Sequence, residues 1–474
     1  MAGVVLRVWI YRTRIGIPDS DEAIVGLMVR HILHGHIPTF FYGQAYGGSQ
    51  EALLTAPVFA VFGSSWLALR IVPILLSGIA SLVIWRAGQR IIGEPAAGVA
   101  GALFWLWPPF MLDKLTHQWG FYASGTIYCA LLILLALRVV ERPDRARAGA
   151  FGLVLGLGFW QTTQLVPIAV PVIAWMIWRR PAALRQLWVA APLAVVGAAP
   201  WFLWNLRHGW GSFSYPIRDT TDYAHRLRLF FSPVVPMMLG LRAPFRQVPI
   251  VPALLVDLLY AVLVGLFLVG AYRSRRRDVS ILYAIVAAFP FIYAINPETA
   301  LDLTPGYIVI LTPVLVLLLA QLATSYPRAV TAGALAIVVS AVTVHRMNAY
   351  DPWTNKQETA PRNLAPLIST LDRLGLDHVY ASYWLAYVLD FDSNERIVVA
   401  QNQFRAVTFS GGQAIPTRDP IPRYPPYQDE VRQARHGFVF FRLGIGSVRI
   451  IRPLEQHGYR RYDVGAFEIY APPA

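Results

Sequence analysis

Long apolar runs, repeated through the first three quarters of the chain, constrain the fold more than any other feature. A helix needs about 20 mainly apolar residues to cross a hydrocarbon core of about 30 Å. Runs of this order recur at 66–85, 96–112, 121–138, 148–161, 164–178, 187–204, 250–271, 279–295, 305–323 and 328–344. Together with a first segment, they predict about eleven transmembrane helices. The two short runs around Gln161–Gln164 are either separate helices or one re-entrant pair.

Composition excludes the other classes of protein. Of the 474 residues, 56% are hydrophobic and only 14% are charged, with a mean hydropathy of +0.47. A soluble, disordered or collagen-like chain does not have this composition. The net charge of +14 could suggest nucleic acid, but the basic residues lie mostly between apolar runs and no nucleic-acid-binding motif is present. We therefore expect membrane lipids, and no nucleic acid, as partners.

Arginines in alternate short loops predict the orientation in the membrane. One set holds Arg86 and Arg90, clusters within 138–147, 179–185 and 273–277, and Arg328. The positive-inside rule makes these loops cytoplasmic. The long loop 205–249 then lies on the opposite face. Because Arg is used almost exclusively over Lys, which hints at a GC-rich genome, we expect a multi-pass protein of a bacterial plasma membrane. The single cysteine, Cys129, excludes an intramolecular disulfide.

The two ends of the chain differ from this pattern. Residues 1–17 are short for a span and contain three arginines, so we expect the natural chain to begin upstream. From about residue 346 the hydropathy drops, and short strand-like and helical stretches alternate. The expected strands are Val379–Ser382, Arg396–Ala400, Gly437–Leu443 and Ala466–Ala471, and the expected helices are Leu364–Leu374, Val431–His436 and Val448–His457. We predict a polytopic α-helical domain over 1–345 and an extracytoplasmic α/β domain over 346–474.

Three acids in four residues follow the first apolar segment, in Pro18-Asp19-Ser20-Asp21-Glu22. Acids at a membrane face are costly unless they are solvated or used. One interpretation is structural: Asp19 or Ser20 caps a helix that begins near Glu22, with the acids favourable against the helix dipole. The other is that a carboxylate here serves in catalysis. The local pattern alone favours the cap.

The sequence after these acids carries a resemblance. A helix-like stretch ends at Gly35, the polar turn Tyr42–Glu51 follows, and a helix ending in Phe62-Gly63 precedes Ala68-Leu69-Arg70 at the second span. This order resembles the first external loop of the GT-C superfamily of membrane glycosyltransferases. It is most similar to the branch of protein O-mannosyltransferases and the lipid A aminoarabinose transferase. The resemblance covers roughly residues 15–90 and extends over the rest only as topology.

The resemblance implies an enzyme and assigns its base. Asp21 matches the Asp of the family's Asp-Glu pair, which removes a proton from the acceptor hydroxyl in inverting transfer from a polyprenyl-phosphate sugar. Glu22 would orient the Asp21 side chain, or Asp19 could share the role of the base. The external loop 18–65 would then be catalytic. A carboxylate suits both general-base catalysis and a developing cationic sugar. The acceptor, a glycan, lipid or protein outside the cytoplasm, stays open.

Three departures from the family pattern bear on the remaining site. Relatives often carry a lysine-proline cluster in the polar turn; this chain has none there, and Glu51 could supply a second acid beside Tyr46 and Gln50. Relatives usually carry a second acid in the next external loop as well. Here that loop could bind a sugar through His117, Gln118 and Trp119, although an aromatic belt at the membrane interface explains these residues equally well. Before Tyr307, relatives carry an arginine toward the donor phosphate, and here the residue is Gly306. The candidate replacements are Arg218, Arg226, Arg242 and Arg246.

Other readings of the chain remain open. His31, His34 and His36 could suggest a metal site, but no acid pair accompanies them at metal-like spacing. We expect no metal, although some relatives use a divalent cation. A transporter or flippase for a lipid-linked sugar would explain the spans, but charges within the apolar runs are scarce. A non-catalytic scaffold would explain the altered turn and Gly306.

Overall fold

The structure, a computed structural model, describes residues 1–107, 109–213, 221–242, 249, 252–275, 277–297, 306–321, 326–349, 360–419, 422–442 and 448–473. The chain forms two compact units. The membrane unit comprises residues 1–15, 45–51 and 70–350, and the second unit comprises residues 16–44, 52–69 and 351–474. The units therefore do not follow the order of the chain, because two N-terminal segments pack with the C-terminal domain. The expected division at residues 345 and 346 stays a prediction.

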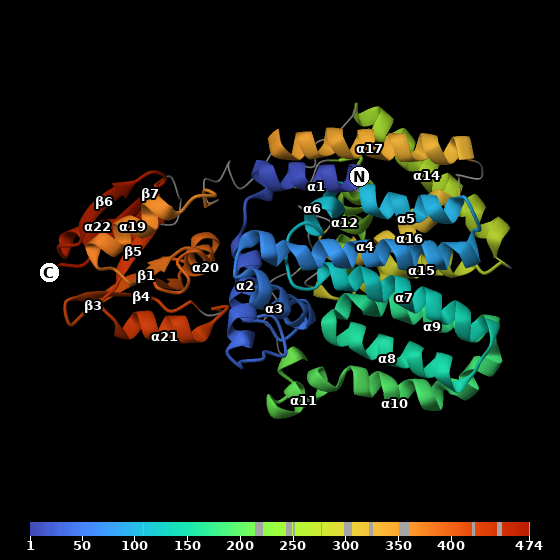
Figure 1. The fold of residues 1–474 in the computed structure, drawn as a ribbon, viewed down its shortest axis with the longest axis horizontal. Helices are drawn as coiled ribbons and strands as arrows, with labels where there is room; N and C mark the ends of the chain where they lie inside the picture. The colour runs from blue at the N-terminus through green and yellow to red at the C-terminus, as the bar shows by residue number, and fades with distance from the viewer. Residues whose placement is uncertain are drawn as a thin grey trace. The chain divides into compact units, whose positions relative to one another are not determined.

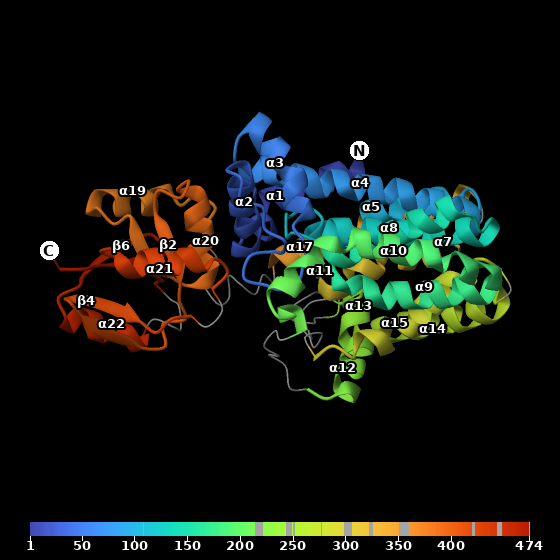
Figure 2. The same ribbon diagram turned by 90° about the horizontal axis from the view of Figure 1, so that it is seen from below.

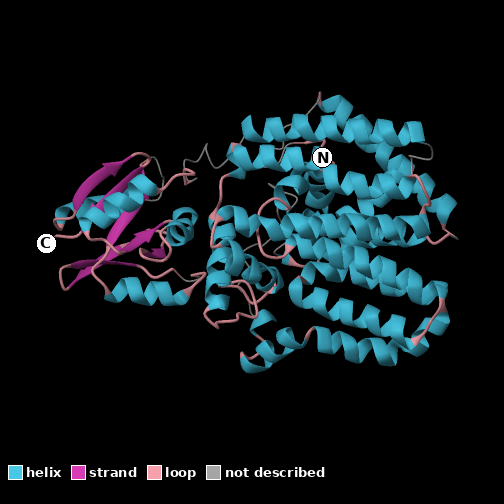
Figure 3. Ribbon diagram, in the orientation of Figure 1, coloured by secondary structure: helices cyan, strands magenta, loops and turns pink. Residues whose placement is uncertain are grey.

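Helices make up the membrane unit (Figures 1 and 3). Every apolar run named above overlaps with a helix. The helices are α1 (Ala2–Arg12), α4 (Trp66–Ile91), α5 (Ala96–Leu106), α6 (Pro109–Lys114), α7 (Tyr122–Glu141), α8 (Arg145–Gln161), α9 (Val166–Arg179), α10 (Leu187–Gly197), α11 (Ala199–Arg207), α12 (Tyr223–Leu229), α13 (Val235–Met238), α14 (Ala253–Ser274), α15 (Ser280–Tyr293), α16 (Thr312–Ala320) and α17 (Tyr326–Ala349).

Four helices in the described chain are long and apolar enough to cross a membrane. They are α4, α7, α14 and residues 327–345 of α17, and the pair α10–α11, bent by 62°, makes up to a fifth. Only 6% of the most apolar stretch of α14 is buried in the protein. A helix that exposes so much apolar surface is suited to contact with lipid. The expected count of about eleven spans stays a prediction.

Glycines bring α8 and α10 close together. A Cβ atom added at Gly152 or Gly156 of α8 would overlap with a backbone carbonyl of α10, that of Ala190 or Ala194. Small residues at such positions let two membrane helices approach closely enough for backbone contact. Helix α8 packs against α7 as well as α10 (Figure 2), and α9 packs against α7 and α15. Helices α7, α8 and α9 carry several of the polar and pocket-lining residues of the membrane unit that are described below.

The second unit contains a mixed five-stranded sheet in the order β2-β1-β5-β7-β6. Its strands are β1 (His378–Ala381), β2 (Val398–Gln401), β5 (Gly437–Phe441), β6 (Arg460–Val464) and β7 (Phe467–Ala471). Strand β1 lies parallel to β2 and β5, and β7 is antiparallel to β5 and β6. A hairpin of β3 (Val407–Ser410) and β4 (Gln413–Pro416) is separate. The expected C-terminal sheet is thus present; its extracytoplasmic location stays a prediction.

Several elements of this unit differ from the expected ones. Helix α21 spans Pro425–Gln433, not Val431–His436. Two prolines occupy its first turn, where proline fits a helix. Helix α20 (Tyr383–Asp392) was not predicted, because it is buried on nearly every side and has no amphipathic pattern. The expected helices near 364–374 and 448–457 are α19 (Ala365–Leu374) and α22 (Val448–Gln456).

The core of the second unit joins its N-terminal and C-terminal segments. Helix α2 (Ser20–Leu33) buries Ile24, Leu27 and Met28 in the same hydrophobic cluster as Leu385 and Leu389 of α20. At about 25 cal/mol per Å² of apolar surface, burial of this kind is the dominant stabilising term. Helix α2 is therefore packed as an element of the C-terminal domain.

Candidate active site

Asp21 lies in the first turn of α2, where the chain prepares the position for a carboxylate. Asp19 is the N-cap of this helix, and its side chain accepts a hydrogen bond from the backbone N–H of Glu22 at 2.9 Å. The structural interpretation of Asp19 is therefore confirmed. Glu22 is fully buried, whereas the Asp21 side chain is 37% exposed. Of the three acids, Asp21 combines solvent access with the favourable end of a helix dipole.

Two residues of the C-terminal domain converge on the Asp21 carboxylate. The Tyr383 hydroxyl donates a hydrogen bond to Oδ1, and the Arg423 Nη2 lies 3.9 Å from the same oxygen. The Arg423 side chain is 15% exposed. A positive charge and a hydrogen-bond donor at this range both stabilise an ionised carboxylate. The arrangement fixes one of the two carboxylate oxygens of Asp21.

Tyr383 is held as a proton donor. Its pKa is raised well above the ordinary range, first because the side chain is buried and second because the Asp21 charge lies beside it. The phenol therefore keeps its proton and donates. Its backbone carbonyl accepts a hydrogen bond from the Ser20 hydroxyl, which ties the start of α20 to the start of α2.

Arg423 lies in a tight slot. With its amide oriented to satisfy both groups, the Gln44 side-chain oxygen accepts hydrogen bonds from Nη1 at 2.5 Å and Nη2 at 3.2 Å of Arg423. The Arg423 backbone N–H donates to the buried Tyr387 hydroxyl at 2.9 Å. Gly43 has a φ of +69°, and a Cβ there would lie 2.5 Å from the Arg423 Cα. The backbone and the side chain of Arg423 are therefore both constrained.

In the membrane unit, Gln50 and Glu51 belong to a buried polar network. Glu51 accepts hydrogen bonds from the Ser124 backbone N–H at 2.8 Å and the Ser124 hydroxyl at 2.6 Å. The Gln161 amide donates to that hydroxyl at 2.9 Å, and its oxygen accepts from the Gln50 N–H at 3.2 Å. Glu51 is 1% exposed. These contacts fix the polar turn against α7 and α8.

Tyr46 and Tyr307 lie in the wall of a pocket of about 590 Å³ within the membrane unit. The lining is mainly apolar and aromatic, with a neutral polar part. The other lining residues are Ala45, Gly47, Phe121, Phe159, Thr162, Thr163, Gln164, Val166, Pro167, Trp201, Ser212, Phe213, Ile292, Tyr293, Ile295, Asn296 and Pro297. Ligand pockets typically combine such walls with a few polar groups that orient the ligand.

His117, Gln118 and Trp119 do not lie in that wall but in a second cluster of the membrane unit. His117 Nδ1 is 3.0 Å from Arg70 Nη2, and its ring is stacked on Trp119 with the centroids 4.6 Å apart. The Lys114 ammonium lies 3.4 Å from the centroid of the Trp119 ring. Gln118 is fully buried and accepts from the Gly120 N–H at 3.3 Å. The cluster contains the basic side chains of Arg70, Lys114 and His117, and Asp113 Oδ1 lies 3.6 Å from His117 Nε2.

Of the four arginines proposed for the donor phosphate, the structure describes two, Arg226 and Arg242. Arg218 and Arg246 lie outside the described residues. Arg226 donates from Nε to the Ala294 carbonyl at 2.8 Å. Arg242 pairs with Asp257 at 3.8 Å.

Within the described ranges, no group of three or more His, Cys, Asp or Glu side chains is placed to hold a metal ion. His31 instead contacts Tyr42 and Glu395.

Sequence reasoning missed four residues of these clusters. Tyr383 and Arg423 are about 360 and 400 positions from Asp21, and nothing in their local sequence marks them. Ser124 is one of several small residues in an apolar run. Gln161 had a signal, because glutamine at the tip between two apolar runs needs polar partners.

Comparisons with known proteins match part of the chain to a family and the whole chain to a known fold. Residues 51–204 match the dolichyl-phosphate-mannose-protein mannosyltransferase family. The chain is 28% identical over 163 residues to the lipid A galacturonosyltransferase RgtD of Rhizobium johnstonii, which is 33% of this chain and 32% of that protein. The crystal structure of ArnT from Cupriavidus metallidurans bound to undecaprenyl phosphate matches with a TM-score of 0.67 and 14% identity, over 100% of this chain and 98% of that one.

The chain has an ArnT-like fold over its full length. The apo structure of the same ArnT also matches, with a TM-score of 0.65. The chain is a multi-pass membrane protein. It spans about a third of the length of the curated relative that it matches, because the alignment covers 32% of RgtD. The family match begins at Glu51, so it does not include Asp21.

Proposed function

We propose that this protein is a membrane glycosyltransferase that transfers a sugar from a polyprenyl-phosphate donor to an acceptor outside the cytoplasm, with Asp21 as the general base. The observation that carries the proposal is the environment of Asp21. A partly exposed carboxylate lies at a helix N-terminus, with Tyr383 and Arg423 both directed to Oδ1. The family match and the similar proteins support the reaction class.

The chemistry follows from the charge that develops at the sugar. The acceptor oxygen attacks the anomeric carbon and gives its proton to the Asp21 carboxylate. The bond from the anomeric carbon to the phosphate oxygen breaks, and its electron pair leaves with the polyprenyl phosphate. A positioned base typically contributes about 10²–10⁴-fold to such a step. The negative charge of Asp21 also favours the cationic character of the sugar at the transition state.

The apolar pocket supports a lipid-linked donor. Its aromatic and aliphatic lining suits an isoprenoid chain, and the neutral polar side chains of Thr162, Gln164 and Asn296 can orient a polar group. The arginine-rich short loops support an active site on the extracytoplasmic face. Lys114, whose ammonium lies over the Trp119 ring, offers a cation to a leaving phosphate.

A panel of radiolabelled polyprenyl-phosphate sugars, incubated with the purified protein in detergent or nanodiscs, tests the proposal. We expect turnover of one donor, a loss of at least about 100-fold in Asp21→Asn, and no loss in Asp372→Asn. Asp372 is a matched control, because it lies on the surface of the C-terminal domain in an exposed pair with Arg396. Turnover retained by Asp21→Asn would exclude Asp21 as the base. If the wild-type protein neither turned over nor bound any donor, a non-catalytic scaffold would be favoured instead.

A further inference from the structure

We propose that Tyr383 and Arg423 of the C-terminal domain are positioning residues that hold Oδ1 of Asp21, so that Oδ2 receives the acceptor proton. The inference rests on the proposed function. In the described chain, the polar contacts of the Asp21 carboxylate both go to Oδ1. An oxygen fixed by a donor and a cation cannot turn toward substrate without losing both, whereas the other oxygen can. The C-terminal domain thereby completes the catalytic group.

The loop that carries Arg423 is built to place it. The Tyr387 hydroxyl accepts from the Arg423 N–H and donates to the Gln401 side-chain oxygen at 2.7 Å. The Gln401 amide in turn donates to Asp419 at 3.0 Å. Tyr387, Gln401 and Asp419 are all buried. A fully satisfied buried network of this kind specifies one conformation, because each lost hydrogen bond would leave a buried polar group unpaired.

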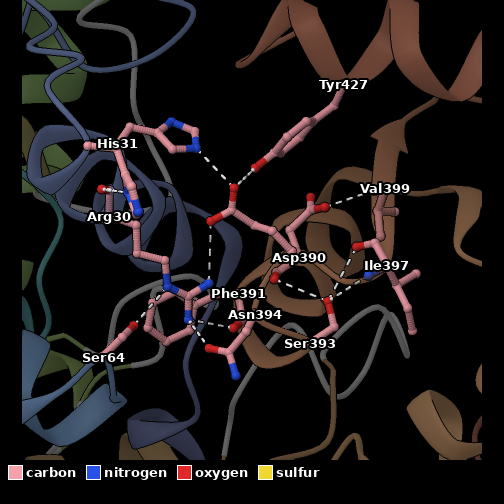
Figure 4. A network of polar contacts seen from close by, with 12 residues as sticks. Arg30, His31, Ser64, Asp390, Phe391, Ser393, Asn394, Ile397, Val399 and Tyr427 are labelled. Carbon is pink, nitrogen blue, oxygen red and sulfur yellow. Dashed lines mark hydrogen bonds and ion pairs between the residues drawn. The ribbon is translucent and has the colours of Figure 1, made fainter.

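The far end of α2 is clamped to the same domain (Figure 4). The Arg30 guanidinium donates to the Phe391 carbonyl at 2.8 Å and to the Asn394 side chain at 2.9 Å. Glu395 lies 3.6 Å from Arg30, and it accepts hydrogen bonds from His31 at 3.0 Å and Tyr427 at 2.8 Å. We call Arg30, His31, Glu395 and Tyr427 the α2 clamp.

The clamp has a functional consequence. Asp21 lies in the first turn of α2, and Arg30 and His31 of the clamp lie in its last turn. Residues of the C-terminal domain therefore fix both ends of α2. A helix of 14 residues is about 21 Å long, at 1.5 Å per residue. Fixing it at both ends sets its position and its rotation, and hence the direction of the Asp21 side chain. The base and its two positioning residues therefore form one body.

The separate effects on kcat and KM test the role. Without a fixed Oδ1, the Asp21 carboxylate turns to directions in which Oδ2 cannot receive the acceptor proton. We expect Arg423→Gln to lower kcat by about 10-fold or more, with the KM for the donor close to wild type. Tyr383→Phe should lower kcat in the same way, and Arg423→Lys should restore part of the wild-type kcat.

Matched variants separate this role from loss of folding. Arg396→Gln and Tyr462→Phe change the same residue types on the surface and in β6 of the C-terminal domain, and we expect an unchanged kcat in both. Thermal unfolding of each variant reports its stability independently. A wild-type kcat in both Arg423→Gln and Tyr383→Phe, with Asp21-dependent turnover intact, would overturn the inference and leave the proposed function standing. A wild-type protein without Asp21-dependent turnover would overturn both.

Discussion

Gly26 of α2 faces the ring of Phe391 in α20 so closely that a Cβ atom would overlap with it. Glycine in the interior of a helix costs roughly 1 kcal/mol relative to alanine. Here it permits the backbone of α2 to lie against an aromatic ring, which is itself in contact with Trp66 at a centroid distance of 4.3 Å. The contact is one reason that α2 packs with the C-terminal domain.

The close approach predicts an effect of substitution at this position. We expect Gly26→Leu to lower the stability of the protein by about 1–3 kcal/mol, because the added side chain must displace the Phe391 ring. Thermal unfolding in detergent measures the change. Gly333→Leu is a matched control, since Gly333 is also helical and a Cβ there meets nothing within 4 Å. Equal changes in stability in the two variants would show that the contact between Gly26 and Phe391 does not decide the cost.

The α2 clamp predicts a pH-dependent contribution to stability. Burial raises the pKa of Glu395, but hydrogen bonds from His31 and Tyr427 and the Arg30 charge outweigh it, and the net shift is downward. A lowered carboxyl pKa contributes stability above the ordinary glutamate range, and this stability is lost as pH falls through the folded-state value. Glu395→Gln should therefore lower the unfolding temperature at neutral pH, and the difference from wild type should shrink in acid.

The control for this prediction is an exposed ion pair of the same domain. The side chains of Arg396 and Asp372 are 60% and 43% exposed, and exposed pairs contribute about 0–1 kcal/mol. Asp372→Asn should therefore have little effect at any pH. A difference between Glu395→Gln and wild type that stayed constant down to strongly acidic pH would contradict the assigned role of the Glu395 charge.

Glu51 acts as a cap for α7, which lacks a capping side chain at its own N-cap residue. Its carboxylate accepts from the Ser124 N–H in the first turn, where helix N–H groups lack partners within the helix. We expect Glu51→Ala to cost about 1–3 kcal/mol, because buried donors lose their acceptor. Glu51→Gln keeps a side-chain oxygen and should cost less.

Glu141 provides the comparison for Glu51 in thermal unfolding measurements. Glu141 lies at the other end of α7, in an ion pair with Arg90. The Arg90 and Glu141 side chains are 36% and 46% exposed, respectively. Glu141→Ala should be close to wild type. An effect of Glu51→Ala no larger than that of Glu141→Ala would show that the network does not stabilise the turn.

Sequence and structure agree where local pattern decides the fold. The apolar runs predicted the positions of the membrane helices, and the hydropathy drop near residue 346 predicted a sheet-containing domain. The sequence also indicated Asp19 as a cap, because a cap is a contact over three residues. It could not reveal that α2 packs on α20, since burial partners 360 residues apart leave no local signature. For the same reason, Tyr383 and Arg423 were not predicted.

The slot of Arg423 gives the sharpest test that joins packing to catalysis. Gly43 and Gly35 both have positive φ, +69° and +88°, so alanine strains the backbone at either position. Only at Gly43 does an added Cβ meet Arg423, at 2.5 Å from its Cα; at Gly35 it meets nothing within 4 Å. We expect Gly43→Ala to displace Arg423 and to lower kcat as Arg423→Gln does. Gly35→Ala should lose about 1 kcal/mol of stability with an unchanged kcat. An equal kcat in the two alanine variants would mean that Arg423 reaches Asp21 without help from the turn at Gly43.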